Sequence, residues 1–348
     1  MRKLTPFLLL VVIGLLSSNC MGIRHLSIDT REPGQIAWLP HITSVAVVNN
    51  VVQQPDDVFH NHRPINGDWA RDTVSSENIA FIYTEAMAQF LEEEGHFDRV
   101  IFVREPIRTD SDFFTEHPLT PEAMGRIMRQ TGANAVISLD QLLIRTDLEG
   151  YFNVVGVRFA RLIARIQSVI RVYMPTLEGQ IPVIHYTDSL VWRNLDPSGT
   201  ILYAAKSLPL MRERAMQQLV VLAANRMTNT LSPHWVTKER WYYTSLGARM
   251  REGARFAQGN QWDRALERWE VAFRNARGRE KAKAANNVAL AHEMLDDIET
   301  ALEWATTAYE LFQQSTSPNS LERRRSLLYK NELQRRLQVV NQLLNMTD

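Results

Sequence analysis

The residue best placed to do chemistry is Cys20, the only cysteine of the chain. It follows an apolar run at residues 7–16, which is preceded by Arg2 and Lys3. A positive start, an apolar run about half as long as the ~20 residues of a membrane span, and small polar residues before a cysteine are typical of a secretion signal that ends in a lipid attachment site. A lone cysteine is otherwise most often a small buried residue. The position of this thiol favours lipidation, and an ordinary cleaved signal peptide is the alternative.

The residues around Cys20 depart from the usual lipidation motif at one position, because Asn19 stands where Ala or Gly is expected. We expect a signal peptide at residues 1–19 and a tether rich in Gly and Pro at residues 20–40. Acyl chains on Cys20 would anchor the chain to the outer membrane. No acidic run follows Cys20, which favours the periplasmic face of that membrane.

Two further pairs of side chains have spacings that a metal site or a catalytic site could use. His60 and His62 would point to one side of a strand and could share a metal ion, but the prolines and the glycine around them favour a solvated loop. His185 and Asp188 are three positions apart in an expected strand, so they should point to opposite faces. Asp140 has no evident base or nucleophile beside it. With no catalytic motif present, we expect no enzyme, no cofactor, no metal and no small-molecule substrate.

The charge balance excludes a strongly basic or acidic function class. Lys plus Arg and Asp plus Glu are both 39. Removal of the signal with Arg2 and Lys3 leaves 37 basic residues against 39 acidic ones. That balance gives no electrostatic reason to expect nucleic acid as a partner. Once Cys20 is acylated, no thiol remains for a disulfide, so stability must come from packing.

Hydrophobic patterning predicts an α/β domain with a mixed sheet and packed helices at residues 41–235. Val45, Val47 and Val48 indicate a buried strand, and Thr120 before Pro121 is a helix N-cap signal. Strands and helices alternate and then give way to a strand hairpin and a long helix. The expected elements are strands at 42–52, 97–104, 135–143, 154–174 and 181–193, and helices from Ser75 or Ser76 to Glu94, from 121 to Gly132, and at 206–231.

Residues 236–348 predict a helical repeat domain with a capping helix at 321–344. Two helix pairs, each with a tight turn, repeat at a spacing of 36 residues. Neither pair can bury its apolar stripe alone. The pattern resembles tetratricopeptide repeats, although the period of that family is 34 and three repeats are usual. The matching positions are Gly253, Phe256, Trp262, Ala265, Trp269 and Ala272, then Ala289, His292, Ile298, Ala301, Ala305 and Ala308.

The resemblance to tetratricopeptide repeats implies a peptide-binding groove on the face formed by the first helix of each pair. Lys283 and Asn286 would hold a peptide backbone or a carboxylate there, and the alternative is that they are solvated helix positions. Carried over by position, the groove comprises Met250, Ala254, Gln258, Lys283, Asn286, Leu290 and Glu293.

The chain as a whole resembles an uncharacterised lipoprotein family of Bacteroidota, a domain of unknown function. The segments that carry this resemblance are residues 46–50, 131–142, 170–175, 188–192 and 232–235. The order of elements in the first domain is also similar, more distantly, to the small α/β domain of the curli secretion lipoprotein and of lipoprotein activators of penicillin-binding proteins.

These observations favour a non-catalytic, membrane-anchored scaffold or adaptor that binds a protein or peptide partner through its helical repeats. The alternative is an accessory lipoprotein that regulates cell-wall synthesis or secretion through the α/β domain. The two hypotheses differ in which domain holds the partner.

Overall fold

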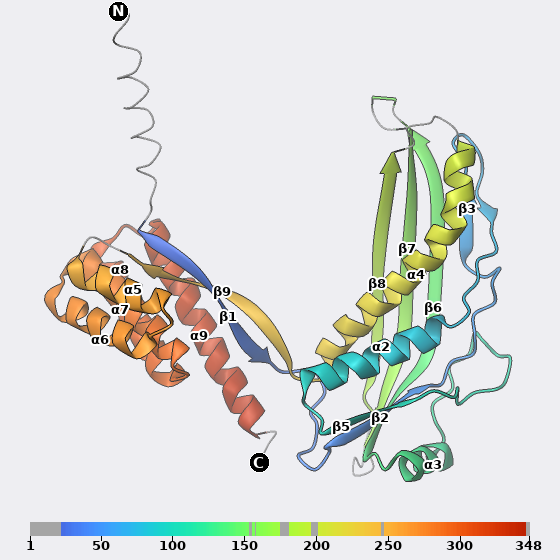
Figure 1. Ribbon diagram of the computed structural model, residues 1–348, viewed down its shortest axis with the longest axis horizontal. Coiled ribbons are helices and arrows are strands. Elements are labelled where there is room, and N and C mark those ends of the chain that lie inside the picture. The colour runs from blue at the N-terminus through green and yellow to red at the C-terminus, as the bar shows by residue number, and fades with distance from the viewer. Residues whose placement is uncertain are drawn as a thin grey trace, which may run out of the picture. The chain divides into compact units, whose positions relative to one another are not determined.

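The structure is a computed structural model that describes residues 22–152, 155–156, 158–174, 181–195, 201–244 and 247–345. The described residues form two compact units, an α/β unit within residues 33–234 and a helical unit that combines residues 22–32 with those described from 235 onward. The predicted fold class is confirmed, since a mixed sheet with packed helices precedes a run of helices (Figure 1). The predicted signal peptide and Cys20 lie outside the described residues.

The expected tether at residues 20–40 is wrong over much of its length, because it contains strand β1 (Ile23–Glu32). β1 pairs with β9 (His234–Tyr243) in a two-stranded sheet, the ribbon. The amide of Thr244 donates to the Gly22 carbonyl at one end of the ribbon, and the Thr30 hydroxyl donates to the Val236 carbonyl near the other, so the strands are antiparallel. Both strands belong to the helical unit, although about 200 residues separate them in sequence.

The seven-stranded sheet of the α/β unit combines a parallel and an antiparallel part. β6 pairs in parallel with β2 and β3, whereas β6, β7 and β8 form an antiparallel meander. The predicted hairpin is therefore confirmed. The elements of the unit are β2 (Ser44–Asn49), β3 (His60–Arg63), β4 (Ala70–Arg71), α2 (Ile79–Glu94), β5 (Arg99–Val103), α3 (Pro121–Thr131), β6 (Ala135–Phe152), β7 (Arg158–Tyr173), β8 (Val183–Leu195) and α4 (Ile201–Leu231).

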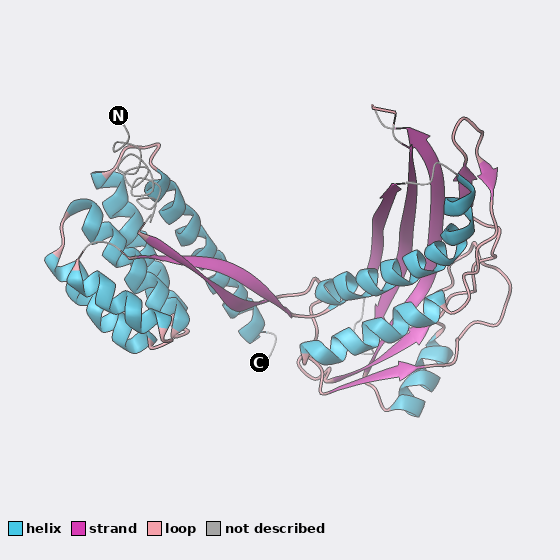
Figure 2. Ribbon diagram, turned by 45° about the horizontal axis from the view of Figure 1, so that its top comes forward, coloured by secondary structure: helices cyan, strands magenta, loops and turns pink. Residues whose placement is uncertain are grey.

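Helices cover the two faces of this sheet unequally. α2 and α4 lie side by side across one face, where Tyr83 and Leu219 pack with Ile166 in the main core (Figure 2). α3 packs on the other face through Ile127, in a smaller cluster that includes Val136. Among the described helices, only α3 packs on that second face.

The predicted N-cap is confirmed for α3 but not for α2. The Thr120 hydroxyl accepts from the amide of Ala123 at 3.2 Å, as expected for the cap of α3. The expected cap of α2 is wrong, because Asn78 precedes this helix with a positive φ of 63° and no side-chain cap. The Ser76 hydroxyl donates instead to the Gln54 carbonyl, so it is not available to cap the helix.

The loop expected around His60 and His62 is also wrong, because His60 begins strand β3 and is fully buried. Its Nδ1 lies 2.8 Å from the Thr146 hydroxyl on β6. Asn61 donates to Asp147 at 3.0 Å on the other side of the same strand pair. Side-chain bonds to β6 thus hold a polar segment in the sheet.

The helical unit consists of the ribbon and five described helices. The tight turn predicted within each helix pair is confirmed, at residues 259–261 in the first pair and 296–297 in the second, and the last helix coincides with the expected capping helix. No described helix is both long and apolar enough to cross a membrane. The helices are α5 (Ala248–Gln258), α6 (Trp262–Asn275), α7 (Gly278–Met294), α8 (Ile298–Ser315) and α9 (Leu321–Asn345).

Candidate functional site

Most residues of the predicted peptide groove are buried within the helical unit. Gln258 is exposed at the end of α5, and Lys283 is half-buried on α7. The other five predicted groove residues are at most 4% exposed, and they are Met250, Ala254, Asn286, Leu290 and Glu293.

The ribbon explains this burial, because it covers the face that the first helices of the two pairs form. Tyr242 and Tyr243 at the end of β9 share one apolar cluster with Met250 and Leu290. Asn287 accepts from the backbone amide of Tyr243 and donates to its carbonyl, both at 2.7 Å. An asparagine thus holds an extended backbone as the repeat resemblance implies, but it is Asn287, and the backbone belongs to the same chain.

Glu293 is the centre of a buried charge cluster that fastens the ribbon to two helices. Its carboxylate accepts from Arg240 of β9 at 2.9 Å, from Tyr329 of α9 at 2.8 Å and from Arg336 of α9 at 2.8 Å. Burial and the adjacent Glu293 carboxylate raise the pKa of Tyr329 well above its usual value. All three hydrogen-bond donors to Glu293 belong to the helical unit, so this cluster is structural.

A basic pocket of about 390 Å³ remains open at the end of the ribbon. Arg279 and Lys283 of α7 and Arg325 of α9 line it, and Glu322 is the one carboxylate among its described lining residues. Arg279 pairs with Glu322, and this hydrogen bond lowers the pKa of Glu322 even though burial opposes the shift. Lys283 lies 2.7 Å from Glu280 at the pocket's edge. The lining therefore carries an excess of positive charge.

Asn286, one helical turn from Lys283, is completely buried. Neither its amide nitrogen nor its amide oxygen has a hydrogen-bond partner among the described residues, and the same holds for the hydroxyl of buried Ser326 beside Arg325. An unpaired buried polar group costs about 1–3 kcal/mol. A buried water would remove that cost.

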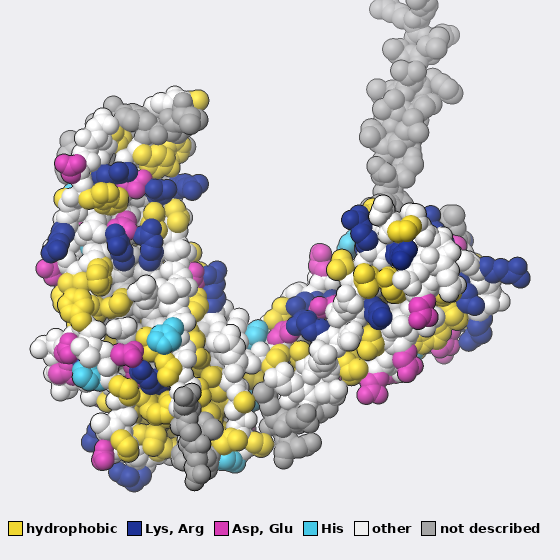
Figure 3. All heavy atoms as spheres, turned by 180° about the vertical axis from the view of Figure 1, so that it is seen from behind, with side chains coloured by type: hydrophobic (Ala, Val, Ile, Leu, Met, Phe, Trp, Pro, Cys, Tyr) yellow, Lys and Arg dark blue, Asp and Glu magenta, His cyan; other side chains and the backbone are white. Residues whose placement is uncertain are grey.

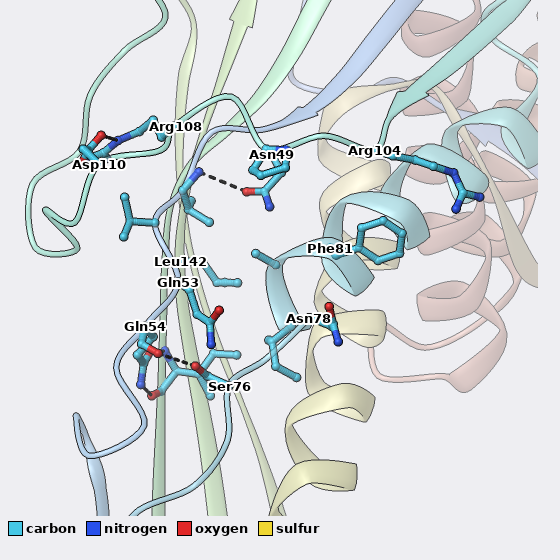
Figure 4. Close-up of a pocket in the computed structure, with 16 residues that line it drawn as sticks. Asn49, Gln53, Gln54, Ser76, Asn78, Phe81, Arg104, Arg108, Asp110 and Leu142 are labelled. Atoms are coloured by element: carbon cyan, nitrogen blue, oxygen red, sulfur yellow. Dashed lines mark hydrogen bonds and ion pairs between the residues drawn. The ribbon is translucent and has the colours of Figure 1, made fainter.

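A second pocket, of about 470 Å³, lies in the α/β unit where β2 and β5 end (Figure 4). Asn49 bonds the amide of Val51, and Gln54 bonds both backbone groups of Ile144 at 2.7 and 2.8 Å. The hydrogen bond with Arg108 lowers the pKa of Asp110. These polar side chains are engaged in shaping the surrounding loops.

Arg104 is the cation of this second pocket that remains most exposed, with 72% of its side chain accessible. It lies 4.0 Å from Glu85, and Figure 4 shows it pointing away from the other labelled residues. The uncapped start of α2 opens onto the same pocket. The described lining residues thus offer amides and a guanidinium for hydrogen bonding to a polar group.

Asp140 is a buried structural carboxylate. It accepts from Asn50 at 2.9 Å and from Ser138 at 2.5 Å through one oxygen, and from Arg171 at 2.6 Å through the other. Arg171 also binds Glu116 at 2.8 Å, so the cluster holds the loop before α3 onto the sheet. Ser138 lies two positions before Asp140 on β6, whereas Asn50 and Arg171 are 90 and 31 residues away, so a short window of sequence does not reveal these two partners.

Two family models match separate parts of the chain. A family model described as a domain of unknown function (DUF8603) matches residues 42–243, more than half of the chain. The chain belongs to this family. A second model, also described as a domain of unknown function (DUF6340), matches residues 251–335. No curated protein matches the sequence.

Several solved structures show a limited similarity to the chain. A minor lipoprotein from Acinetobacter baumannii is 8% identical with a TM-score of 0.26, covering 55% of this chain and 96% of that one. Rare lipoprotein B from Shewanella oneidensis is 11% identical with a TM-score of 0.24, covering 53% and 89%. A protein from Xanthomonas campestris is 9% identical with a TM-score of 0.24, covering 56% and 84%. TM-scores this low carry no information about the function of this chain.

Proposed function

We propose that the protein is a non-catalytic lipoprotein of the cell envelope that acts as an adaptor, and that its helical unit binds an acidic segment of a partner protein. The observation that supports this most directly is the basic pocket. Lys283, Arg279 and Arg325 line it, and Glu322 is the one carboxylate among its described lining residues. A carboxylate in this pocket would find three cations among its lining residues.

The proposal includes lipid attachment at Cys20 and anchoring to the periplasmic face of the outer membrane. Met21 and Gly22 are the residues between Cys20 and the start of β1. Two residues span at most about 7 Å. A lipid on Cys20 would therefore hold the helical unit, and with it the basic pocket, close to the membrane surface.

The resemblances to tetratricopeptide repeats and to lipoproteins of Bacteroidota belong to this proposal. The close approach of Gly253 to the Trp269 ring supports the first, since a small residue facing a large one lets paired helices pack closely. The second rests on the segments at residues 46–50, 131–142, 170–175, 188–192 and 232–235.

Peptide binding tests the role of the pocket. The probe is a short fluorescent peptide of Gly, Ser and Glu, and its binding is followed by fluorescence anisotropy. We expect Lys283→Glu combined with Arg325→Glu to weaken binding about ten-fold, because two attractions become repulsions. Arg255→Glu, at an exposed position of α5, is the matched control and should bind like the wild type. Equal binding by all three proteins would refute the pocket as the site.

Lipid attachment is tested separately in the native host. A clickable palmitate analogue should label the wild-type protein but not Cys20→Ser, and only the wild type should sediment with membranes. Native-membrane pull-downs with these two proteins then ask whether a partner requires the anchor. If the wild-type protein takes up no palmitate analogue, lipid attachment is refuted and the chain is an ordinary exported protein. The test of the basic pocket does not depend on that result.

A further inference from the structure

Strand β8 forms a long free edge of the seven-stranded sheet. It pairs with β7 over thirteen consecutive residues without a register shift, and no other described strand pairs with it. The usual strand has about five or six residues. The outer side of β8 thus presents an extended row of backbone donors and acceptors.

This edge lacks most of the features with which proteins block strand addition. Such features are short length, lysine, internal proline and bulges. β8 contains neither lysine nor proline and has no bulge against β7. Its one carboxylate, Asp188, faces the helices, where it is bonded to Tyr186 and Arg226. The edge is therefore competent to receive another strand.

The side of β8 that faces α4 leaves apolar side chains incompletely covered. Tyr186, Leu190 and Trp192 pack against the main core but are only partly buried. Apolar residues at alternate positions of an added strand would complete this cover.

The opposite side of β8 continues a sheet face that the described helices leave open above α3, and arginines concentrate on it. Arg145 stands directly opposite Arg165, and Arg161 directly opposite Arg193. Figure 3 shows this side of the molecule, with Lys and Arg side chains gathered across the middle of the α/β unit. Like charges directly across a sheet are destabilising, so packing alone does not account for these two pairs.

Carboxylates on this face only partly offset the arginines. Asp147 accepts from both Arg145 and Arg165, and Glu149 accepts from Arg161. Arg193, on the free edge itself, is exposed and has no ion pair among the described residues. The face next to the edge is therefore net positive.

Charge also selects the kind of strand that fits. The six exposed residues of β8 include no carboxylate, so a second copy of β8 would bring none to the arginines. If two copies of β8 paired antiparallel about Ser189, His185 of each copy would lie opposite Arg193 of the other. An acidic strand satisfies the charges that a second copy leaves unpaired.

We propose that β8 receives an extended segment of a partner protein by strand addition, with alternating apolar and acidic residues. The apolar residues cover the open rim of the core beside Trp192, and the acidic residues lie next to Arg193 and Arg161. This surface belongs to the α/β unit and does not depend on the basic pocket.

The test uses a fluorescent peptide of alternating Val and Glu, about ten residues long, with the full-length protein. Two N-methylated versions of the peptide separate strand addition from charge attraction. In one version the methyl groups are on the alternate amides that would donate hydrogen bonds to β8, and in the other they are on the amides that point away from β8. We expect only one version to lose binding. Hydrogen exchange should slow at residues 183–195 when the unmodified peptide binds.

Charge reversal provides the second measurement. Arg193→Glu should weaken binding of the Val/Glu peptide about five-fold or more and strengthen binding of a Val/Lys peptide. Arg126→Glu on α3 is the matched control, since it is an exposed arginine of the same unit. Equal binding by both N-methylated peptides, no exchange protection of β8, or no binding at about 1 mM peptide would each overturn the proposal.

Discussion

Mild acid should destabilise the α/β unit through His60. This side chain is fully buried, with Nδ1 2.8 Å from the Thr146 hydroxyl and Nε2 3.4 Å from the Gln54 side-chain nitrogen. Burial is the largest cause that lowers the pKa of His60 from 6.5 to about 4, and the charge of Arg212 adds to it. The folded protein thus keeps the imidazole neutral in a range where the unfolded chain protonates it.

The sign of the effect follows from that difference. Above pH 6.5 both states carry neutral His60, so its contribution to stability is fully present. As the pH falls from 6.5 to about 4, the unfolded state alone binds the proton, and stability is lost. At ~1.36 kcal/mol for each pKa unit, the complete loss is about 3 kcal/mol.

Urea unfolding, followed by circular dichroism at several pH values, measures this loss. His60→Gln should flatten the fall in unfolding free energy between pH 6.5 and pH 4 by about 3 kcal/mol, although the variant starts from a lower stability. His185→Gln is the control, because that histidine is exposed and should leave the pH profile unchanged. A profile for His60→Gln parallel to that of the wild type would refute the reasoning.

Two further predictions concern the helical unit. Gly253→Ala would place a Cβ 2.5 Å from Nε1 of buried Trp269 and disturb the hydrogen bond from Nε1 to a backbone carbonyl. Thermal unfolding should therefore show that the free energy of unfolding falls by about 1–3 kcal/mol. Gly247→Ala is the control and should change little, because the nearest atom to its Cβ would be 3.8 Å away. Glu293→Ala should cost about 3 kcal/mol, because buried Arg240 loses its carboxylate partner at 2.9 Å and keeps the more distant Glu332 at 3.8 Å. Combining it with Arg240→Met should restore part of that loss if the poorly paired charge is the cause.

The sequence predicts most of the fold because most elements are signalled locally. The alternation through residues 158–173 and 183–195 identifies the hairpin, and Thr120 before Pro121 identifies the start of α3. Strand β1 was missed because its partner lies about 200 residues away, and its charged and polar residues hide the alternation. Such pairing leaves no signal within a short window of sequence.

The candidate site was harder to predict because its burial depends on that same distant pairing. A helical repeat alone would expose Met250, Leu290 and Glu293, and the ribbon is what buries them. The sequence positions of Arg279 and Arg325 do not indicate a shared pocket, since that pocket forms between two helices. The residues of a site were visible in the sequence, but not which of them would remain accessible.

The ribbon also limits where a partner can bind. Asn287 already holds the backbone of Tyr243, and a segment linked in the same chain competes at an effective concentration of about the millimolar range or above. A free peptide at micromolar concentration would not displace it, because the ribbon is further fixed by Arg240 and Glu293. The helix face that resembles a peptide groove is therefore closed by its own chain, which is why we propose the basic pocket at the ribbon's end and the free edge of β8 as the binding surfaces.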